Sequence, residues 1–293
     1  MITVRQIDLR NSEYEDEIID LLSIAFREDR LQRGFLFLNI SSPEADLPSL
    51  FLAAFEGDKI VGCNAFIAND FEINQRSLTC FQSCWSATHP DHQGKGVFLL
   101  IQENAKQILK KQGAALIYGL PNDLSHPIFT KKLDFFSIKC MLTRIPNIPL
   151  IRDLWFKNLA SLQSSSAKVL KPNEYQVSSL KKNVNSEIIE IAHNESYLWG
   201  KMESRNKFGI RLTIFNIGGM QIKSKQDLSA MLTKIYSFGC HFIEIYSCKS
   251  NLNNNFFRFW QVSSTHRFIF FYLNLPEDAI INFNLMRGVS DTF

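Results

Sequence analysis

A glycine-rich turn, Gly94-Lys95-Gly96, separates a strand-like run at 78–88 from an amphipathic helix. The helix is predicted from apolar residues at helical spacing, namely Val97, Leu100, Ile101, Ala105, Ile108 and Leu109. Such a turn presents unpaired backbone N–H groups and the positive end of a helix dipole, which together hold a phosphate group. Lys95 adds a cation. The sequence therefore predicts an α/β unit with an anion site at the start of the helix.

Two well-known glycine motifs do not fit this turn. A P-loop requires Ser or Thr after its Gly-Lys pair, whereas Gly96 follows Lys95. A dinucleotide-binding fingerprint requires a third glycine at position 99, which is Leu99. The alternatives that remain are another phosphate-binding loop and a turn that only joins the strand to the helix.

The same residues resemble the acetyl-coenzyme A signature of the GNAT acyltransferase superfamily, Q/R-x-x-G-x-G/A. Gln93, Gly96 and Phe98 occupy the three marked places, and Phe98 departs from the pattern because Gly or Ala is usual there. The resemblance implies acyl-CoA as cosubstrate, with its pyrophosphate at the turn and its pantetheine arm paired with the backbone of the preceding strand. The binding residues that it implies are Ala87, Thr88, Gln93, Gly94, Lys95, Gly96, Val97 and Phe98.

The order of elements over residues 1–146 also matches a GNAT domain. Apolar patterns predict strands at 2–7, 50–55, 59–67, 78–88, 116–119 and 136–143, and helices at 14–27, 97–112 and 126–133. The implied fold is α/β, a mixed sheet whose two central parallel strands splay apart around the pantetheine arm. Asn122 follows the second of these strands, where the family frequently has an Asn that binds the arm. An ordinary turn residue is the alternative.

Two positions depart from the family's usual proton-transfer groups. Phe129 stands where a Tyr commonly protonates the departing thiolate, and Gln82 lies near the place of a Glu base in some members. We therefore expect an acceptor amine that loses its proton easily, such as that of an amino sugar. The candidate catalytic residues are His126, which titrates near neutral pH, and Ser125; helix capping by Ser125 is their alternative role. Asp70 and Glu72 could orient the amine or be solvated loop carboxylates.

Net charge, apolar runs and cysteine positions limit the kinds of partner and the cellular compartment that we expect. The net charge of +3 does not indicate nucleic acid or a membrane as partner, and no apolar run is long enough to cross a bilayer. Six cysteines fall in apolar strand-like runs without metal-ligand spacing: Cys63, Cys80, Cys84, Cys140, Cys240 and Cys248. This is typical of reduced core cysteines, so we expect a cytoplasmic protein without a metal; an acylated Cys84 is a minor alternative.

The second half resembles the first. A helix up to Gly239 followed by a strand at 242–246 repeats the layout around Gly113, but without a glycine loop between Ile222 and Leu228. We expect residues 1–146 to be the acyl-CoA domain, 147–182 a linker and 183–293 a degenerate GNAT-like domain that serves as substrate platform. A chance repetition of helix and strand is the alternative.

The segment at 197–205 carries the candidate acceptor residues. A nucleotide base could stack on Tyr197 or Trp199, and Lys201 or Arg205 could bind a diphosphate, whereas aromatics packed inward are the alternative. With the tail at 283–293, the chain resembles N-acyltransferases of nucleotide-linked amino sugars in surface-polysaccharide synthesis, with a dTDP-linked 3-amino-3,6-dideoxyhexose favoured. The alternatives are acetylation of another small-molecule or protein amine and an inactive CoA-binding module. A homodimer is conceivable.

Overall fold

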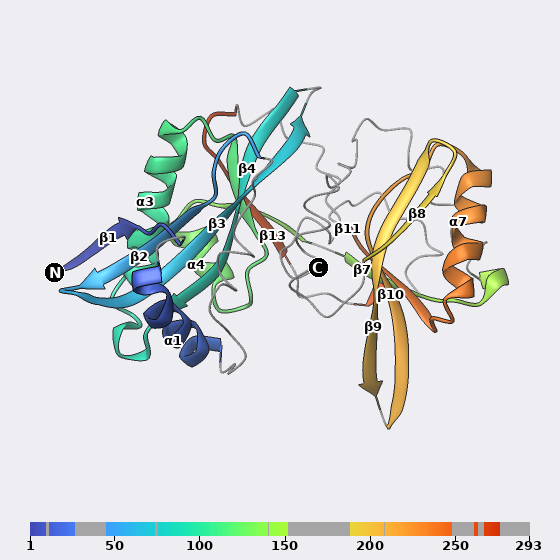
Figure 1. Cartoon of the computed structure of the whole chain (residues 1–293), viewed down its shortest axis with the longest axis horizontal. Helices are drawn as coiled ribbons and strands as arrows, with labels where there is room; N and C mark the ends of the chain where they lie inside the picture. The colour runs from blue at the N-terminus through green and yellow to red at the C-terminus, as the bar shows by residue number, and fades with distance from the viewer. Residues whose placement is uncertain are drawn as a thin grey trace. The chain divides into compact units, whose positions relative to one another are not determined.

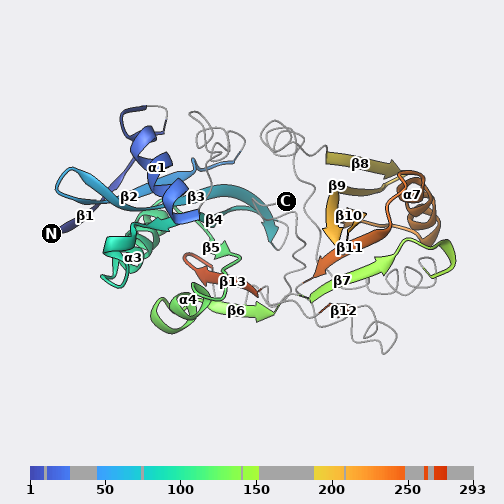
Figure 2. The same ribbon diagram turned by 90° about the horizontal axis from the view of Figure 1, so that it is seen from below.

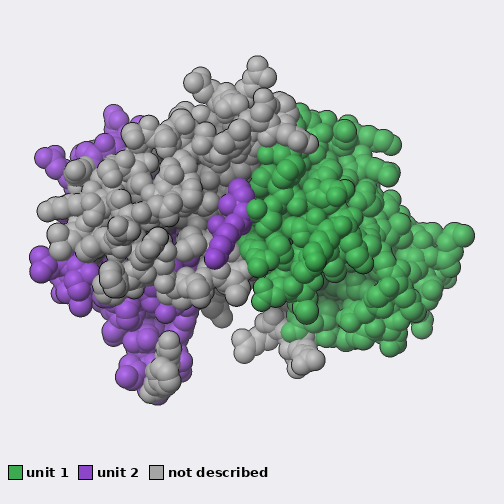
Figure 3. All heavy atoms as spheres, turned by 180° about the vertical axis from the view of Figure 1, so that it is seen from behind, with its two compact units in different colours: residues 1–137, 267–280 green, residues 138–266, 281–293 purple. Residues whose placement is uncertain are grey.

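The computed structural model describes residues 1–9, 12–26, 45–73, 76–139, 141–151, 188–207, 209–247, 261–262 and 267–275. The chain divides into two compact units, one of residues 1–137 and 267–280 and the other of residues 138–266 and 281–293 (Figure 3).

Within the described residues, the first unit holds a seven-stranded mixed sheet in the order β1-β2-β3-β4-β5-β13-β6 (Figure 1). Its strands are β1 (Ile2–Gln6), β2 (Leu50–Glu56), β3 (Lys59–Ile73), β4 (Arg76–Thr88), β5 (Leu116–Gly119), β6 (Phe136–Lys139) and β13 (Arg267–Tyr272). Its helices are η1 (Ser12–Tyr14), α1 (Glu15–Phe26), η2 (Pro90–His92), α3 (Val97–Lys111) and α4 (His126–Lys132). These elements confirm the predicted α/β order, with β3 longer than predicted.

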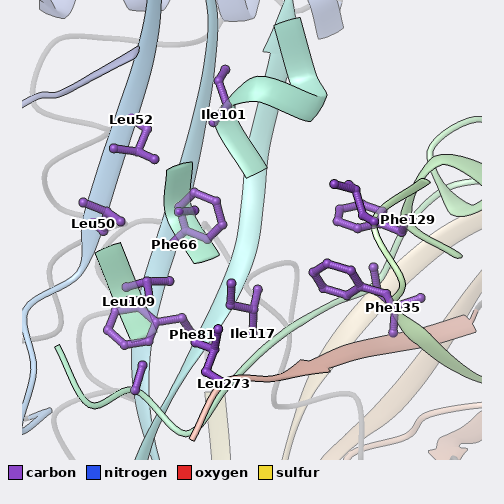
Figure 4. Packing of buried hydrophobic residues seen from close by; sticks show 14 of the residues in the cluster. Leu50, Leu52, Phe66, Phe81, Ile101, Leu109, Ile117, Phe129, Phe135 and Leu273 are labelled. Atoms are coloured by element: carbon purple, nitrogen blue, oxygen red, sulfur yellow. The ribbon is translucent and has the colours of Figure 1, made fainter. Parts of the chain in front are cut away.

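Helices cover both faces of this sheet, with α1 on one face and α3 and α4 on the other (Figure 2). Leu21 and Leu22 of α1 belong to one buried cluster, and Ile101 of α3 and Phe129 of α4 belong to the other (Figure 4). Leu100, which fits the same apolar pattern, is 37% exposed, so the buried stripe of α3 is narrower than predicted.

The two central parallel strands separate after a short pairing. β4 pairs with β5 only from Cys80↔Leu116 to Gln82↔Tyr118, although β4 continues to Thr88. From Ser83 onward, no described strand pairs with this edge of β4. The predicted splay of the central strands is confirmed.

The described part of the second unit contains a six-stranded sheet in the order β12-β7-β11-β10-β9-β8. The elements are β7 (Met141–Pro146), β8 (Ile188–His193), β9 (Ser196–Lys207), β10 (Ile210–Gln221), α7 (Lys225–Ser237), β11 (Phe242–Ser247) and β12 (Gln261–Val262). β10 and β11 are parallel and joined through α7, as β4 and β5 are joined through α3. The second unit therefore repeats the strand–helix–strand core of the first, as the fold prediction requires.

The division of the chain differs from the predicted boundary at 146. The predicted strand at 136–143 is two strands, of which β6 joins the first sheet and β7 pairs with β11 in the second. β13 comes from the predicted second domain and pairs with β5 in the first unit. Of the predicted linker, residues 147–151 are described, and the Asn147 side-chain amide donates to the carbonyl oxygen of Cys240. Residues 152–187 lie outside the described part of the chain.

Candidate active site

A β-bulge distorts β4 just beyond its last pair with β5. Cys63 and Ala65 of β3 face Ala87 and Cys84 of β4, so Trp85 and Ser86 together oppose Asn64. Trp85 has φ +50°, a left-handed conformation that a non-glycine residue seldom adopts. A bulge breaks the regular ladder and redirects backbone groups, so the N–H groups of this segment are reoriented just where the pairing with β5 has ended.

The glycine loop follows at the end of β4. Gly94 and Gly96 have φ +77° and +79°, and Gly96 is the N-cap of α3. Among the described residues, no side chain caps this helix by a hydrogen bond, and the first turn carries no acid. Gln93, Gly94, Lys95 and Gly96 are exposed. Because the first N–H groups of a helix have no intrahelical partner, the loop leaves them and Lys95 available to a phosphate group.

A histidine ties the loop to the neighbouring hairpin. His92 Nε2 lies 3.0 Å from Glu56 Oε2, at the end of β2. The hydrogen bond to His92 and the charge of that ring lower the pKa of Glu56. Sequence analysis did not single out this pair, because its two members are 36 positions apart.

The corresponding helix of the second unit ends differently. The Ser224 hydroxyl accepts a hydrogen bond from the Asp227 N–H, and Asp227 adds an acid to the first turn of α7. Asn194 and Ser196 donate to the two Asp227 oxygens, and these bonds, that of Ser196 foremost, lower the pKa of Asp227. A capped helix end that carries a carboxylate repels anions, so of these two helix ends the start of α3 is the one suited to a phosphate group.

Asn122 lies between β5 and α4, but its side chain forms a turn. The Asn122 Oδ1 accepts from the Ser125 N–H at 2.8 Å and from the Ser125 Oγ at 3.0 Å. This oxygen is thus occupied in the manner of an ordinary Asx turn, the alternative to pantetheine binding. Ser125 is the N-cap residue of α4 without a side-chain capping bond, because its hydroxyl donates to Asn122 instead.

His126 is held between two partners. The Arg267 guanidinium can only donate, so Nδ1 of His126 accepts at 2.8 Å, and Nε2 carries the proton toward Ser137 Oγ, also at 2.8 Å. Partial burial and then the charge of Arg267 lower the pKa of His126, against a smaller opposing effect of Asp123. A neutral imidazole with both nitrogens engaged is not arranged as a general base. The catalytic role of His126 and Ser125 therefore stays a prediction that this geometry does not favour.

The usual acid position is apolar and enclosed. Phe129 is 5% exposed, and its ring lies edge-on to those of Phe98, at 5.2 Å, and Phe135, at 4.9 Å. The departure at Phe98 and the departure at Phe129 thus form one contact between α3 and α4. Gln82 is buried in β4, opposite Tyr118.

Asp70 lies toward the opposite end of β4 from the glycine loop. Its carboxylate accepts from the Thr79 hydroxyl at 2.6 Å and from the Asp46 N–H at 3.1 Å. Thr79 precedes Thr88 by nine residues, or about 30 Å of extended strand. The structure does not bring Asp70 together with the loop, and the Glu72 side chain lies outside the described residues.

The four residues predicted to bind the nucleotide, Tyr197, Trp199, Lys201 and Arg205, lie on β9. Trp199 is 4% exposed, and its Nε1 lies 2.5 Å from where a Cβ on Gly219 would stand. Lys201 is buried, and its Nζ lies 3.6 Å from Glu203 Oε1. The Arg205 guanidinium forms ion pairs with the carboxylates of Glu203 and Glu244. Tyr197 is half-buried, and burial raises its pKa to about 12. Because Trp199 is buried, a nucleotide base cannot stack on its ring in this structure. The burial agrees with the alternative of aromatic side chains packed inward, although they lie on a strand and not on a helix.

Other reactive groups are buried or dispersed. Cys63, Cys80, Cys84 and Cys240 are buried thiols that form no disulfide within the described residues, and burial raises the pKa of Cys63 to about 12. A thiol held neutral is a poor nucleophile, which argues against acyl transfer through a buried cysteine. In the part of the chain that the structure describes, no His, Cys, Asp or Glu side chains group as metal ligands. None of the described helices has the length and apolar character to span a membrane.

A comparison with protein families identifies the first unit. Residues 6–136 match the model of the acetyltransferase (GNAT) domain. These residues form a GNAT acetyltransferase domain. The match covers β2 to β5 with the bulge and the glycine loop, and it supports a CoA-dependent N-acyltransferase.

Solved structures extend the likeness of fold to most of the chain. A GCN5-related N-acetyltransferase from Anabaena variabilis is 12% identical with TM-score 0.65, over 94% of this chain and 73% of that one. A probable N-acyltransferase of unknown function from Enterococcus faecalis is 13% identical with TM-score 0.64, over the same shares. A GCN5-related N-acetyltransferase from Kribbella flavida is 11% identical with TM-score 0.57, over 94% and 71%. No curated protein matches the chain in sequence.

Proposed function

We propose that this GNAT enzyme transfers an acyl group from acyl-CoA to the amine of a nucleotide-linked amino sugar. The favoured acceptor is a dTDP-linked 3-amino-3,6-dideoxyhexose, for surface-polysaccharide synthesis. The observation that carries the donor half of the proposal is the β4 bulge beside an uncapped, glycine-headed helix. The acceptor half rests on two observations. Phe129 and Gln82 stand where the family's usual acid and base are expected, and the sequence resembles N-acyltransferases of nucleotide-linked amino sugars.

The donor binds along β4 and at the start of α3. The pantetheine arm pairs with β4 between Ser83 and Thr88, beyond the last pair with β5, as an added strand would. The pyrophosphate meets the N–H groups of the loop at Gln93–Phe98 and the cation of Lys95. Each charge-assisted hydrogen bond contributes about 1.5–3 kcal/mol. Phe98 narrows the space beside the arm because its ring packs on Phe129.

The acceptor amine attacks the thioester directly. Its nitrogen forms a bond to the carbonyl carbon, the carbonyl oxygen becomes an oxyanion, and backbone N–H groups of the bulge stabilise that charge. The C–S bond then breaks, the thiolate leaves and takes up a proton, and the new amide nitrogen loses one. No carboxylate stands on the bulged segment from Ser83 to Thr88 to remove a proton from the amine.

This scarcity of bases favours a weakly basic amine. A lysine ammonium, with a pKa of about 10.4, is almost wholly protonated at neutral pH. The oxygen substituents of an amino sugar withdraw electrons, so a larger fraction of its amine is neutral and ready to attack. The nucleotide is assigned to the second unit, where Tyr197 and Arg205 are the partly exposed members of the predicted set.

The test of the acceptor is a thiol-release screen with acetyl-CoA and longer acyl-CoAs. We expect turnover with nucleotide-linked amino sugars at a kcat/KM at least tenfold above that with free amino sugars, polyamines or lysine peptides. Equal or better turnover with a lysine peptide would overturn the acceptor proposal and leave the donor site untouched.

The donor site is tested by Gly96→Ala. We expect a rise in KM for acyl-CoA of about tenfold with little change in KM for the acceptor, because a Cβ narrows the phosphate loop and φ +79° disfavours L residues. Gly113→Ala is the matched control. Gly113 has φ +86° at the other end of α3 and has the same open space around its Cβ position. If both variants change KM alike, backbone strain accounts for the effect and the phosphate assignment fails.

A further inference from the structure

A buried polar network lies under the β4 bulge. Asn64 of β3 and Gln102 of α3 are both 0% exposed. Asn64 Nδ2 donates to Ser83 Oγ at 3.2 Å, and Gln102 Nε2 donates to both Asn64 Oδ1 and Ser83 Oγ at 3.1 Å. The Ser86 hydroxyl donates to Asn64 Oδ1. Four side chains from β3, β4 and α3 are thus joined.

The network holds both ends of the distorted segment. Asn64 is the single β3 residue that faces the doubled pair Trp85-Ser86, so it stands where the ladder is irregular. Ser83 is the first β4 residue beyond the last pair with β5. The bulge interrupts the regular pairing between β3 and β4. Hydrogen bonds of the Asn64 side chain therefore connect the two strands where that pairing is missing.

Gln102 lowers the stability of the fold at its position. Its Oε1 is buried and has no hydrogen-bond partner in the described part of the chain. A buried carbonyl oxygen without a donor lowers stability, and an apolar side chain of the same length would avoid that loss. Stability alone does not account for a glutamine on the buried face of α3.

We propose that Asn64 and Gln102 are positioning residues that fix the β4 bulge so that its backbone N–H groups point to the thioester oxygen. The proposal rests on the proposed acyl transfer. Gln102 connects the helix that begins at the phosphate loop to the strand that carries the bulge. The phosphate site and the oxyanion site are thereby held in one frame.

The test replaces Gln102 with Met, which keeps the length and apolar packing but donates no hydrogen bond. We expect kcat to fall between about 10- and 100-fold, because a small displacement of preorganised donors costs that much. KM for acyl-CoA should stay within twofold, and Tm should be unchanged or higher. Amide hydrogen exchange at Trp85 and Ser86 should accelerate at least tenfold. Asn104→Met is the matched control, since Asn104 is a partly exposed residue of the same helix whose amide donates to the Leu100 carbonyl in a solvent-exposed bond.

A second pair of variants separates the hydroxyl from the fold. Ser86→Ala should lower kcat as Gln102→Met does, and Ser86→Thr, which retains the hydroxyl, should restore it to within threefold of the original. A Gln102→Met variant with lower Tm but unchanged kcat, or equal kcat in both Ser86 variants, overturns the proposal. If the original protein acylates no amine, the proposed function fails, whereas faster amide exchange in Gln102→Met still supports the positioning role.

Discussion

At the scale of single residues, His126 shows how one contact decides a chemical role. The sequence marks it as a titratable group at the start of a helix, open to either direction of proton transfer. Arg267 arrives from 141 positions away and occupies Nδ1. A guanidinium neighbour favours the neutral imidazole, so the residue anchors α4 to β13 and does not take up a proton near neutral pH.

The pH dependence of stability tests this assignment. Because its pKa is lowered below 6.5, His126 binds fewer protons when folded than when unfolded, so stability falls as pH decreases below about 6.5. His126→Gln should be less stable than the original by about 1 kcal/mol at pH 7.5, from lost hydrogen bonds, and the difference should narrow at pH 5.5. Urea unfolding at both pH values measures it. Ser137→Ala keeps the titration and should retain the original pH trend. A difference that grows at low pH would show a histidine stabilised in its charged form.

At the scale of elements, two helices with the same topological place differ at their first turn. Both α3 and α7 connect parallel central strands. α3 begins with Gly96 in a left-handed conformation, and α7 begins with a serine cap and an acid. The difference of a few residues leaves the start of α3 suited to an anion, as proposed, whereas the start of α7 is capped by its own side chains.

Ser224→Ala tests the structural role of the α7 cap. Loss of the bond to the Asp227 N–H should lower the free energy of unfolding by about 1 kcal/mol, a usual value for an N-cap. The affinity for CoA should not change, since the proposed donor site is in the other unit. Ser237→Ala at the C-terminal end of α7, where the hydroxyl donates to the Lys234 carbonyl, should cost less than half as much. A weakened CoA affinity in Ser224→Ala would place part of the donor site in the second unit.

At the scale of the whole molecule, the two units exchange strands along the chain. β7 leaves the first 146 residues for the second sheet, and β13 returns from the second half to pair with β5. Ile269 of β13 is 0% exposed in the same buried cluster as Ile101 and Phe129. The core of the acyl-CoA unit therefore depends on residues far outside the 6–136 match.

Ile269→Ala should destabilise the first unit by about 2–5 kcal/mol, the usual cost of truncating a fully buried aliphatic side chain. Thermal unfolding followed in the presence of CoA should show the loss. Ile210→Ala, at a 62% exposed position of β10, is the control and should change stability by less than about 0.5 kcal/mol. A fragment of residues 1–146 should fail to unfold cooperatively, because β5 would lack its neighbour. Cooperative unfolding near the Tm of the full chain would contradict the exchange of strands.

The strand, glycine turn and helix from Leu78 to Leu109 could be predicted from the sequence alone, and they also indicated the domain family. Those elements depend on apolar spacing and backbone freedom within some thirty residues, which the order of residues records directly. The helix–glycine–strand repeat of the second half was visible for the same reason. Polar residues at buried positions, Asn64 and Gln102 in apolar surroundings, were the overlooked local signal.

Contacts between segments remote in sequence became known from the tertiary structure alone. The bulge opposite Asn64, the place of Arg267 beside His126, the burial of Trp199 and the strand exchange all join residues remote in sequence. Strand pairing is specified by which sheet edges are free and which apolar faces match once the chain has collapsed. A strand of the right pattern fits more than one such edge, so its partner is settled by the rest of the packed core and not by its own residues.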